Sequence, residues 1–263
     1  MLSQSTLRLG HGPELKIVRG GKGAPLVWLH GMAAPGADDE VLNALAPDFE
    51  VIAPQMPGLV DLGELAELPT LHDLVLLYDS VLGALGIEAA VLAGHGFGGL
   101  LAAELAALAP RRVRALVLVS PLGLWSDEHP VEDIFALRQP QVEELIWSGA
   151  RARPEPPQVA EEDAIEAYIR FANSLGAMAN YTWPIPDRGL RRRLYRIAAP
   201  TLVLASRQDA WIPAAYAQDF AVGIAGARHS RLEGSHMALY EDPASFARNL
   251  TAFVGGLSRD LAD

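Results

Sequence analysis

Short apolar runs alternate with longer amphipathic patterns along most of this 263-residue chain, and this alternation restricts the fold more than any other feature. Apolar runs of roughly four to eight residues between turn residues are typical of strands, and apolar residues at every third or fourth position are typical of half-buried helices. Strands that are apolar on both faces belong to parallel sheets covered by helices on both sides. The sequence therefore predicts an α/β fold with a doubly wound, mostly parallel sheet.

The elements can be assigned to residue ranges. Strands are predicted at Leu15–Arg19, Leu26–His30, Glu50–Ala53, Ala90–Gly94, Ala115–Ser120, Thr201–Ala205 and Arg228–Glu233. Helices are predicted at Leu71–Leu85, Phe97–Leu108, Ala214–Val222 and Ala244–Val254. After the first strands, strand and helix mostly follow each other in turn, as crossover connections between parallel strands require.

The alternation stops over residues 121–188, which are rich in Pro, Glu, Asp, Trp and Tyr. Helical patterns lie near Val131–Trp147 and Glu161–Ala179, with the proline-rich loop Ala152–Pro157 between them. Because this segment separates two predicted sheet strands, we interpret it as a helical cap inserted into a core of residues 1–120 and 189–263. We expect a lid that shapes an apolar pocket and excludes water, rather than an extension that only packs.

Composition excludes several classes of function. A net charge of -11 and a pI near 5.1 disfavour nucleic acid and anionic membranes as partners. The chain has no cysteine, and its seven histidines show no metal-ligand spacing, so we predict no metal site and no cofactor. No apolar run reaches the roughly 18 residues of a membrane span, and no signal peptide is visible at the N-terminus, which together predict a cytoplasmic protein. The oligomeric state stays open.

Residues 94–99 read Gly-His-Gly-Phe-Gly-Gly, between a predicted strand and a predicted helix. The pattern G-x-S-x-G in this context forms a sharp turn that exposes a nucleophilic serine. Here glycine, Gly96, stands at the serine position, and glycine relieves the backbone strain of such a turn. An acyl-enzyme mechanism through residue 96 is excluded, because loss of the nucleophile costs about 10⁶ in turnover.

Two further segments carry candidate catalytic groups in the order nucleophile, acid, histidine. Asp209 follows the predicted strand Thr201–Ala205, and His236 follows Arg228–Glu233. Alone, Asp209 would be read as a helix cap and His236 as a packing residue. Together, and downstream of the turn at Gly96, they predict an acid that orients a histidine base.

Backbone amides complete the candidate chemistry. After the strand that ends in His30-Gly31, the N–H of Met32 is expected to point into the cleft, unless the pair is only a strand-ending turn. The N–H of Phe97 lies at a helix N-terminus, which favours negative charge. We expect these two amides to form an oxyanion hole.

These segments resemble the α/β-hydrolase superfamily, in particular its lid-bearing bacterial esterases and C–C bond hydrolases. The resemblance covers nearly the whole chain and rests on His30-Gly31, Pro54–Gly58, Gly94–Gly99, Ala199–Asp209, Gly234–His236 and Glu241–Pro243. It implies the α/β-hydrolase fold and a small hydrophobic carbonyl compound as substrate. Two residues depart from the pattern: Gln55 replaces an acidic residue of many relatives, and Gly96 replaces Ser or Asp.

A second motif overlaps the turn, because Gly94, Gly96 and Gly99 also fit the dinucleotide-binding pattern G-x-G-x-x-G. That pattern expects an acidic residue at the end of the next strand to bind a ribose. The next strand ends at Ser120-Pro121 with no acid, and three predicted strands precede the glycines. The sequence therefore disfavours nucleotide binding.

Aromatic residues in loops and in the cap predict an apolar pocket for an aromatic or alicyclic carbonyl compound. The candidate pocket residues are Trp28, His30, Trp125, Trp147, Tyr181 and Trp183. Arginines at 188, 191, 192, 193 and 196 are read as a solvated face, with recognition of a substrate carboxylate as the alternative.

Three hypotheses remain for function. In the first, the chain is an enzyme whose His236 and Asp209 act as a general base on water or on an acidic substrate proton, as in hydrolysis, a cofactor-free lyase or an oxygenase. In the second, the chain is a serine hydrolase that has lost its nucleophile, naturally or by mutation. In the third, it is a non-catalytic binding protein. Retention of acid, base and both oxyanion positions favours an enzyme, because a binding protein has no need of them.

Overall fold

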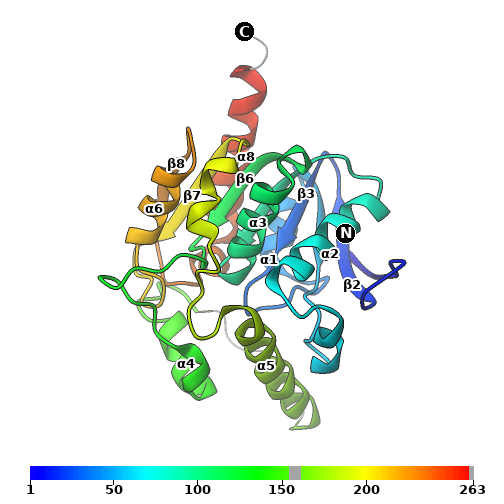
Figure 1. Cartoon of the computed structure of the whole chain (residues 1–263), viewed down its shortest axis with the longest axis vertical. Helices are drawn as coiled ribbons and strands as arrows, with labels where there is room; N and C mark the ends of the chain where they lie inside the picture. The colour runs from blue at the N-terminus through cyan, green and yellow to red at the C-terminus, as the bar shows by residue number, and fades with distance from the viewer. Residues whose placement is uncertain (154–160, 261–263) are drawn as a thin grey trace.

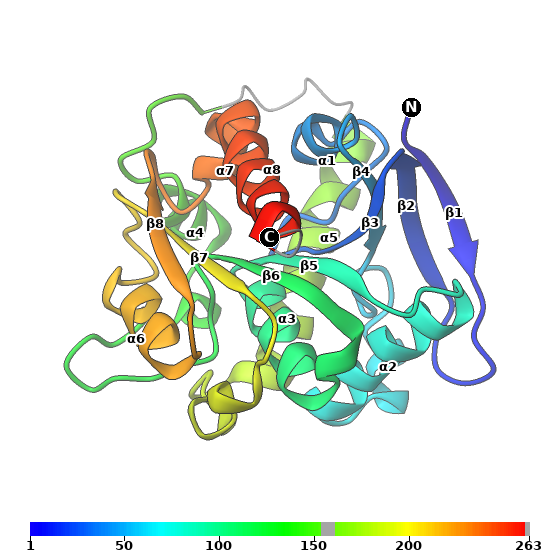
Figure 2. The same cartoon turned by 90° about the horizontal axis from the view of Figure 1, so that it is seen from above.

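A computed structural model of the protein describes residues 1–153 and 161–260. Within these ranges one sheet of eight strands forms the centre of the molecule, in the order β1-β2-β4-β3-β5-β6-β7-β8 (Figures 1 and 2). The strands are β1 Ser3–Leu7, β2 Leu15–Gly21, β3 Ala24–Leu29, β4 Phe49–Pro54, β5 Ala90–His95, β6 Val113–Val119, β7 Thr201–Ser206 and β8 Arg228–Leu232. β1 and β2 pair antiparallel, and β3 to β8 run parallel.

Helices cover both faces of the sheet (Figure 2). α1 Glu40–Leu45, α7 Ala238–Glu241 and α8 Pro243–Asp260 lie on one face, and α2 Leu71–Ala84, α3 Phe97–Leu108 and α6 Ala215–Gly223 lie on the other. Each face has its own apolar core, because side chains alternate between the two sides of every strand. Short 3₁₀ helices occur at Leu62–Glu67, Pro110–Arg112, Ile134–Ala136, Leu190–Arg192 and Leu194–Arg196.

The predicted fold class is confirmed, and the seven predicted strands agree with β2 to β8 within two residues at each end. The short helix α7 and the 3₁₀ helices were not predicted, nor were β1 and α1. β1 has the polar sequence SQSTL and forms an exposed edge strand, so it carries no apolar pattern. The six-residue helix α1 is too short for a clear period, although Asp39 caps it by accepting a hydrogen bond from Leu42 N.

Residues 121–188 connect β6 to β7 and contain α4 Gln139–Ile146 and α5 Glu161–Thr182. Both helices project from one end of the sheet, opposite the C-terminus (Figure 1). The single helix expected over Val131–Trp147 is wrong: a 3₁₀ turn at Ile134–Ala136 precedes α4, which begins only at Gln139. Pro140 explains the break, because its ring would clash with the carbonyl four residues earlier in a continuous helix. The prolines of the predicted loop, at 154, 156 and 157, lie outside the described residues.

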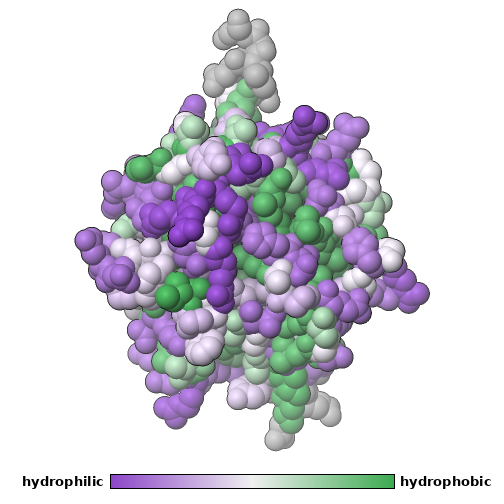
Figure 3. Space-filling view, in the orientation of Figure 1, coloured by the Kyte–Doolittle hydropathy of each residue, from purple (hydrophilic) through white to green (hydrophobic). Residues whose placement is uncertain are grey.

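The outer face of α5 is apolar. Figure 3 shows hydrophobic side chains gathered at the end of the molecule where α5 lies, and Ile165, Tyr168 and Ile169 are exposed there. No helix in the described part of the chain combines the length and the apolar character needed to span a membrane.

Candidate active site

The turn between β5 and α3 is built from glycines that admit no side chain. A Cβ added to Gly98 would lie 1.9 Å from the carbonyl oxygen of Leu29, and one added to Gly94 would lie 2.2 Å from that of Gly98. Backbone atoms cannot move aside as a flexible side chain can. Gly94 and Gly98 are therefore required by the close packing of β3, β5 and α3.

Gly96 differs from these neighbours because it has room. It has φ +54° and ψ -113°, a conformation that residues other than glycine adopt only with strain. A Cβ added there would meet only the ring of His236, at 3.4 Å from Nε2 and 3.7 Å from Cε1. A group bound at this point would therefore lie within reach of the free nitrogen of His236.

The structure brings Asp209 and His236 together, although 27 residues separate them. Asp209 follows β7 and His236 follows β8, so both lie beyond the carboxyl ends of adjacent strands. Nδ1 of His236 donates to Oδ2 of Asp209 at 2.9 Å, and each side chain is 2% exposed. This bond leaves Nε2 of His236 unprotonated and directed toward Gly96.

The carboxylate of Asp209 is fixed by its surroundings. Its Oδ1 accepts hydrogen bonds from the backbone N–H of Trp211 at 3.0 Å and of Ile212 at 2.8 Å. Burial alone would raise the pKa of Asp209, but the charge of His236 and the hydrogen bonds outweigh it and lower the pKa. Asp209 therefore stays ionised and stabilises a protonated His236.

Rings on two sides hold His236 in place. The ring of Trp211 meets it edge-on with centroids 4.8 Å apart, and the ring of His95 lies 4.5 Å away. Nε2 of His95 donates to the carbonyl of His236 at 3.0 Å. Burial lowers the pKa of His95 to about 3, helped by the charge of His236. His95 is thus neutral and packs against the ring of His236.

The loop that carries His236 is held by Glu241, whose role the sequence did not reveal. Oε1 of Glu241 accepts from the backbone N–H of Ser235 at 2.7 Å and from its hydroxyl at 2.6 Å. Oε2 accepts from the backbone N–H of Arg151 at 2.6 Å. These bonds occupy the hydroxyl of Ser235, and Oγ of Ser120 donates to Ser206 at 3.4 Å. Both serines thus have structural hydrogen bonds.

The two proposed oxyanion donors come from different segments of the chain. Phe97 is the first residue of α3, and Met32 follows β3. Among the described residues, neither backbone N–H makes a hydrogen bond. Oγ of Ser174, on α5, donates to the carbonyl of Met32 at 3.1 Å. The cap helix thereby fixes the orientation of the peptide that follows Met32.

The six candidate pocket residues lie in different places. The prediction that Trp28 lines the pocket is wrong. Its side chain points to the opposite face of β3 and is fully buried in the core under α1 and α8, where it lies edge-on to Phe246 with ring centroids 5.7 Å apart. His30 is also structural. Its Nδ1 donates to the carbonyl of Gly31, its Nε2 accepts from Met56 N at 2.8 Å, and burial lowers its pKa to about 4.

The four aromatic candidates in or near the cap also differ from one another. Tyr181 of α5 stacks on Phe97 with centroids 6.2 Å apart and donates to the carbonyl of Leu68 at 2.9 Å, which closes the cap over the turn. Trp125 lines a small cavity of about 90 Å³ that Trp211 also borders. Trp147 packs under the guanidinium of Arg153, and Trp183 is 57% exposed.

Larger cavities flank α5. One of about 850 Å³ lies between α5 and the segment around α4, and one of about 510 Å³ lies between α5, the loops after β3 and β4, the edge strand β1 and its neighbour β2. Met32 lines the second. Among the described residues, no cluster of three or more His, Asp or Glu side chains is arranged to hold a metal ion.

Four of the five arginines at 188–196 have structural partners, which corrects the expectation of a solvated face for those four. Arg193 makes two hydrogen bonds to Glu104, which is fully buried in α3, and Arg191 pairs with Asp219. Arg188 donates to the carbonyl of Tyr181, and Arg196 donates to that of Ala107. These contacts anchor the end of the cap to the core.

Comparison with known proteins identifies the family of the chain. The profile of the Alpha/beta hydrolase family matches residues 26–249, which include the glycine turn, Asp209 and His236. The chain belongs to this family. A protein of Azorhizobium caulinodans is 29% identical over 91% of this chain and 94% of its own length; its name is "Putative carbamate hydrolase RutD". A polyketide synthase of Burkholderia thailandensis, ThaQ, is 28% identical over 91% of this chain, which spans only 12% of that protein.

Solved structures of this alpha/beta hydrolase fold superpose on nearly the whole chain. A bacterial membrane phospholipase A has a TM-score of 0.80 at 22% identity, and covers 98% of this chain and 87% of its own. The 2-hydroxy-6-oxo-6-phenylhexa-2,4-dienoate hydrolase of Rhodococcus sp. strain RHA1 has a TM-score of 0.74 at 19% identity, with 97% and 99% covered. At these identities the likeness concerns the fold.

Proposed function

We propose that this alpha/beta hydrolase cleaves a small hydrophobic ester or carbamate by general-base catalysis, without an acyl-enzyme intermediate. The observation that carries the proposal is the pair of Asp209 and His236, with Nε2 of His236 3.4 Å from the Cβ position of residue 96. A serine is not needed for a histidine to act as a base on water. The relative named as a carbamate hydrolase supports the inclusion of carbamates.

The reaction follows from the positions of these groups. Nε2 of His236 takes a proton from water as the water oxygen bonds to the substrate carbonyl carbon, and the carbonyl electrons move to oxygen. The N–H groups of Met32 and Phe97 stabilise the resulting oxyanion. Collapse of this intermediate breaks the bond to the leaving group, which takes the proton from His236. Asp209 stabilises the protonated histidine throughout.

The burial of the pair strengthens this chemistry. Charges interact more strongly where water is excluded, so ionised Asp209 stabilises the positive charge that His236 gains when it takes a proton from water. We expect the residues 121–188 to act as the lid, since Tyr181 and Ser174 of α5 contact Phe97 and Met32 directly. Positioned general acid–base catalysis contributes about 10²- to 10⁴-fold in rate.

Three variants test the proposal on aryl esters and aryl carbamates. The unmodified chain should turn over at least one of them, and His236→Ala should lower kcat by about 10²- to 10⁴-fold. Gly96→Ser should add a burst of acyl-enzyme formation, and Gly96→Ala, which introduces the same backbone strain without the oxygen, should not. Equal activity of His236→Ala and the unmodified chain would refute the assignment of the base.

The same variants separate the other hypotheses. Activity that appears only in Gly96→Ser would identify a serine hydrolase that has lost its nucleophile. No turnover in any variant, together with binding of the same esters, would indicate a binding protein.

A further inference from the structure

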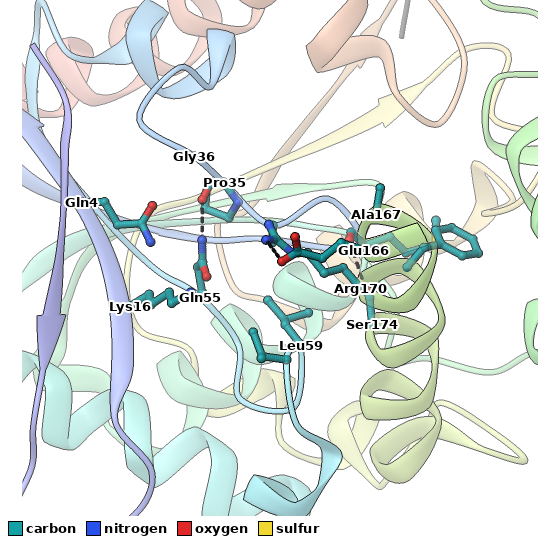
Figure 4. A pocket seen from close by; sticks show the side chains of 14 residues that line it. Gln4, Lys16, Pro35, Gly36, Gln55, Leu59, Glu166, Ala167, Arg170 and Ser174 are labelled. Atoms are coloured by element: carbon teal, nitrogen blue, oxygen red, sulfur yellow. Dashed lines mark hydrogen bonds and ion pairs between the residues drawn. The ribbon is translucent and has the colours of Figure 1, made fainter. Parts of the chain in front are cut away.

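The 510 Å³ cleft beside Met32 is lined by both apolar and polar side chains (Figure 4). Met32, Leu59 and Phe171 line its apolar part. Lys16 and Gln55 lie on one side, and Glu166 and Arg170 of α5 lie on the other (Figure 4). A cleft of this kind suits an elongated ligand whose apolar body ends in a polar group.

The charges in the cleft leave one cation available. Arg170 forms an ion pair with Glu166, one helical turn earlier on α5. Lys16 has no ion-pair partner within 4.0 Å among the described residues, although its charge, after the hydrogen bond and charge of Arg170, helps to lower the pKa of Glu166 across the cleft. The cleft therefore carries one net positive charge on a protein of net charge -11. One available cation matches a monoanion.

Gln55 is neutral and therefore leaves the positive charge of Lys16 unopposed at this position. Its backbone N–H donates to the carbonyl of Lys16 at 2.8 Å, and its side-chain Nε2 donates to the carbonyl of Pro35 at 2.8 Å. A carboxylate at residue 55, directly after β4, would lie beside Lys16 and offset the charge of its ammonium group. The amide instead fixes the loop after β3 and leaves the ammonium group free.

We propose that this cleft binds the carboxylate end of the substrate, with Lys16 as the recognition group. The inference rests on the proposed function, because it places the substrate carbonyl at Met32 N and extends the rest of the molecule along the cleft. The apolar side chains contact the body of the substrate, and its carboxylate reaches Lys16. The substrate class is thus an ester or carbamate that also carries a free carboxylate.

The chain offers a matched control, because Lys16 and Lys22 are its two lysines. Lys22 lies on another surface, beside Gly21 and Glu50. Binding of 5-phenylvalerate and of neutral 5-phenylvaleramide would be measured by calorimetry for the unmodified chain, Lys16→Ala, Lys22→Ala and Gln55→Asp. These probes need no turnover, so the binding result stands apart from the fate of the proposed reaction.

We expect the unmodified chain and Lys22→Ala to bind the carboxylate about 5- to 10-fold more tightly than the amide, as one partly exposed charge contact allows. Lys16→Ala and Gln55→Asp should both lose this preference, and 0.5 M salt should reduce it. Thermal melts of the four proteins would show that each is folded. An equal preference in Lys16→Ala and Lys22→Ala would overturn the proposal, as would the absence of any preference in the unmodified chain.

Activity then distinguishes the two proposals from each other. If the binding preference depends on Lys16 but His236→Ala does not affect any turnover, recognition stands and the proposed reaction fails. If His236 is essential but Lys16→Ala changes kcat/KM equally for carboxylate-bearing esters and for their neutral analogues, the reaction stands and the carboxylate site fails.

Discussion

The glycine turn and the cap helix α5 face each other across the candidate site and are built in different ways. At the turn, backbone packs on backbone, with Gly98 so close to Leu29 that no side chain fits. At α5, single side-chain hydrogen bonds from Ser174 and Tyr181 reach backbone carbonyls of the core. The turn tolerates no substitution at its packed positions, whereas each cap contact can be removed by changing one side chain.

The residues proposed for catalysis and those proposed to select the substrate therefore lie in different parts of the molecule. Asp209 and His236, which would carry the reaction, follow strands of the sheet, are buried and are hydrogen bonded to each other. The residues that would meet the rest of a substrate lie on α5 and on exposed edge strands. Substitutions at the glycine turn, Asp209 or His236 should therefore abolish folding or turnover. Substitutions on α5 or the strands near it should change stability or turnover by small factors.

The largest effect is expected for Gly98→Ala. Its Cβ would lie 1.9 Å from the carbonyl of Leu29 and 2.6 Å from that of His30, so the strands must separate. We expect a loss of about 4–5 kcal/mol in the free energy of unfolding, or no folded protein. Gly255→Ala is the control, because nothing lies within 4 Å of its Cβ position on α8 and alanine favours helices. Urea unfolding measures both, and similar stability of the two variants would contradict the packing argument.

Asp209→Asn should have the next largest effect, on turnover. An amide neither stabilises protonated His236 nor fixes its Nδ1–H tautomer, so kcat should fall by about 10³- to 10⁴-fold while the fold persists. Asp219→Asn, which changes an exposed partner of Arg191, is the control and should leave kcat unchanged. A loss below about tenfold in Asp209→Asn would show that the pair does not perform the chemistry.

These two residues show why the sequence predicted the site better than its surroundings. Asp209, His236 and Gly96 each follow a strong apolar strand pattern, so parallel topology alone brings them to one edge of the sheet. Trp211 was missed although it lies two residues after Asp209. Glu241 was quoted only as part of a family pattern. Its hydrogen bonds to Ser235 and Arg151 depend on loop geometry, which no periodicity encodes.

The pocket was the weakest prediction for a related reason. Trp28 and Trp125 look equivalent in the sequence, each in or beside a strand end. Side-chain direction decides their roles: Trp28 points into the core under α8, and Trp125 borders a small cavity. A shift of one residue along a strand reverses this direction. The cleft with Lys16 could not be predicted at all, because it joins the unpredicted edge strand β1 to α5.

Acid should lower the free energy of unfolding, because two histidines near the site are buried in the neutral form. Burial lowers the pKa of His30 to about 4 and of His95 to about 3, against about 6.5 in the unfolded chain. Below pH 6.5 the unfolded state therefore binds more protons than the folded state, so stability falls as pH falls. At pH 5 each histidine should cost about 2 kcal/mol relative to pH 7.5.

The measurement is the free energy of unfolding in urea at pH 7.5 and pH 5. His95→Gln should reduce the difference between the two pH values by about 2 kcal/mol, even if it lowers stability at both. His229→Gln, on the exposed edge strand β8, is the control and should leave the difference unchanged. An unaltered pH dependence in His95→Gln would mean that His95 is not held neutral.

The smallest effect is expected in the cap, for Ser174→Ala. The change removes the hydrogen bond to the carbonyl of Met32 and should cost about 1 kcal/mol of stability. Ser80→Ala removes a similar bond, from a hydroxyl to the carbonyl of Leu76 at 3.0 Å on α2, and is the control for stability alone. Because Ser174 holds the carbonyl of Met32, the residue whose own N–H is the proposed oxyanion donor, its loss should also lower kcat, by about fivefold, whereas Ser80→Ala should not. Equal kcat in the two variants would show that the cap contact holds the helix without shaping the oxyanion site.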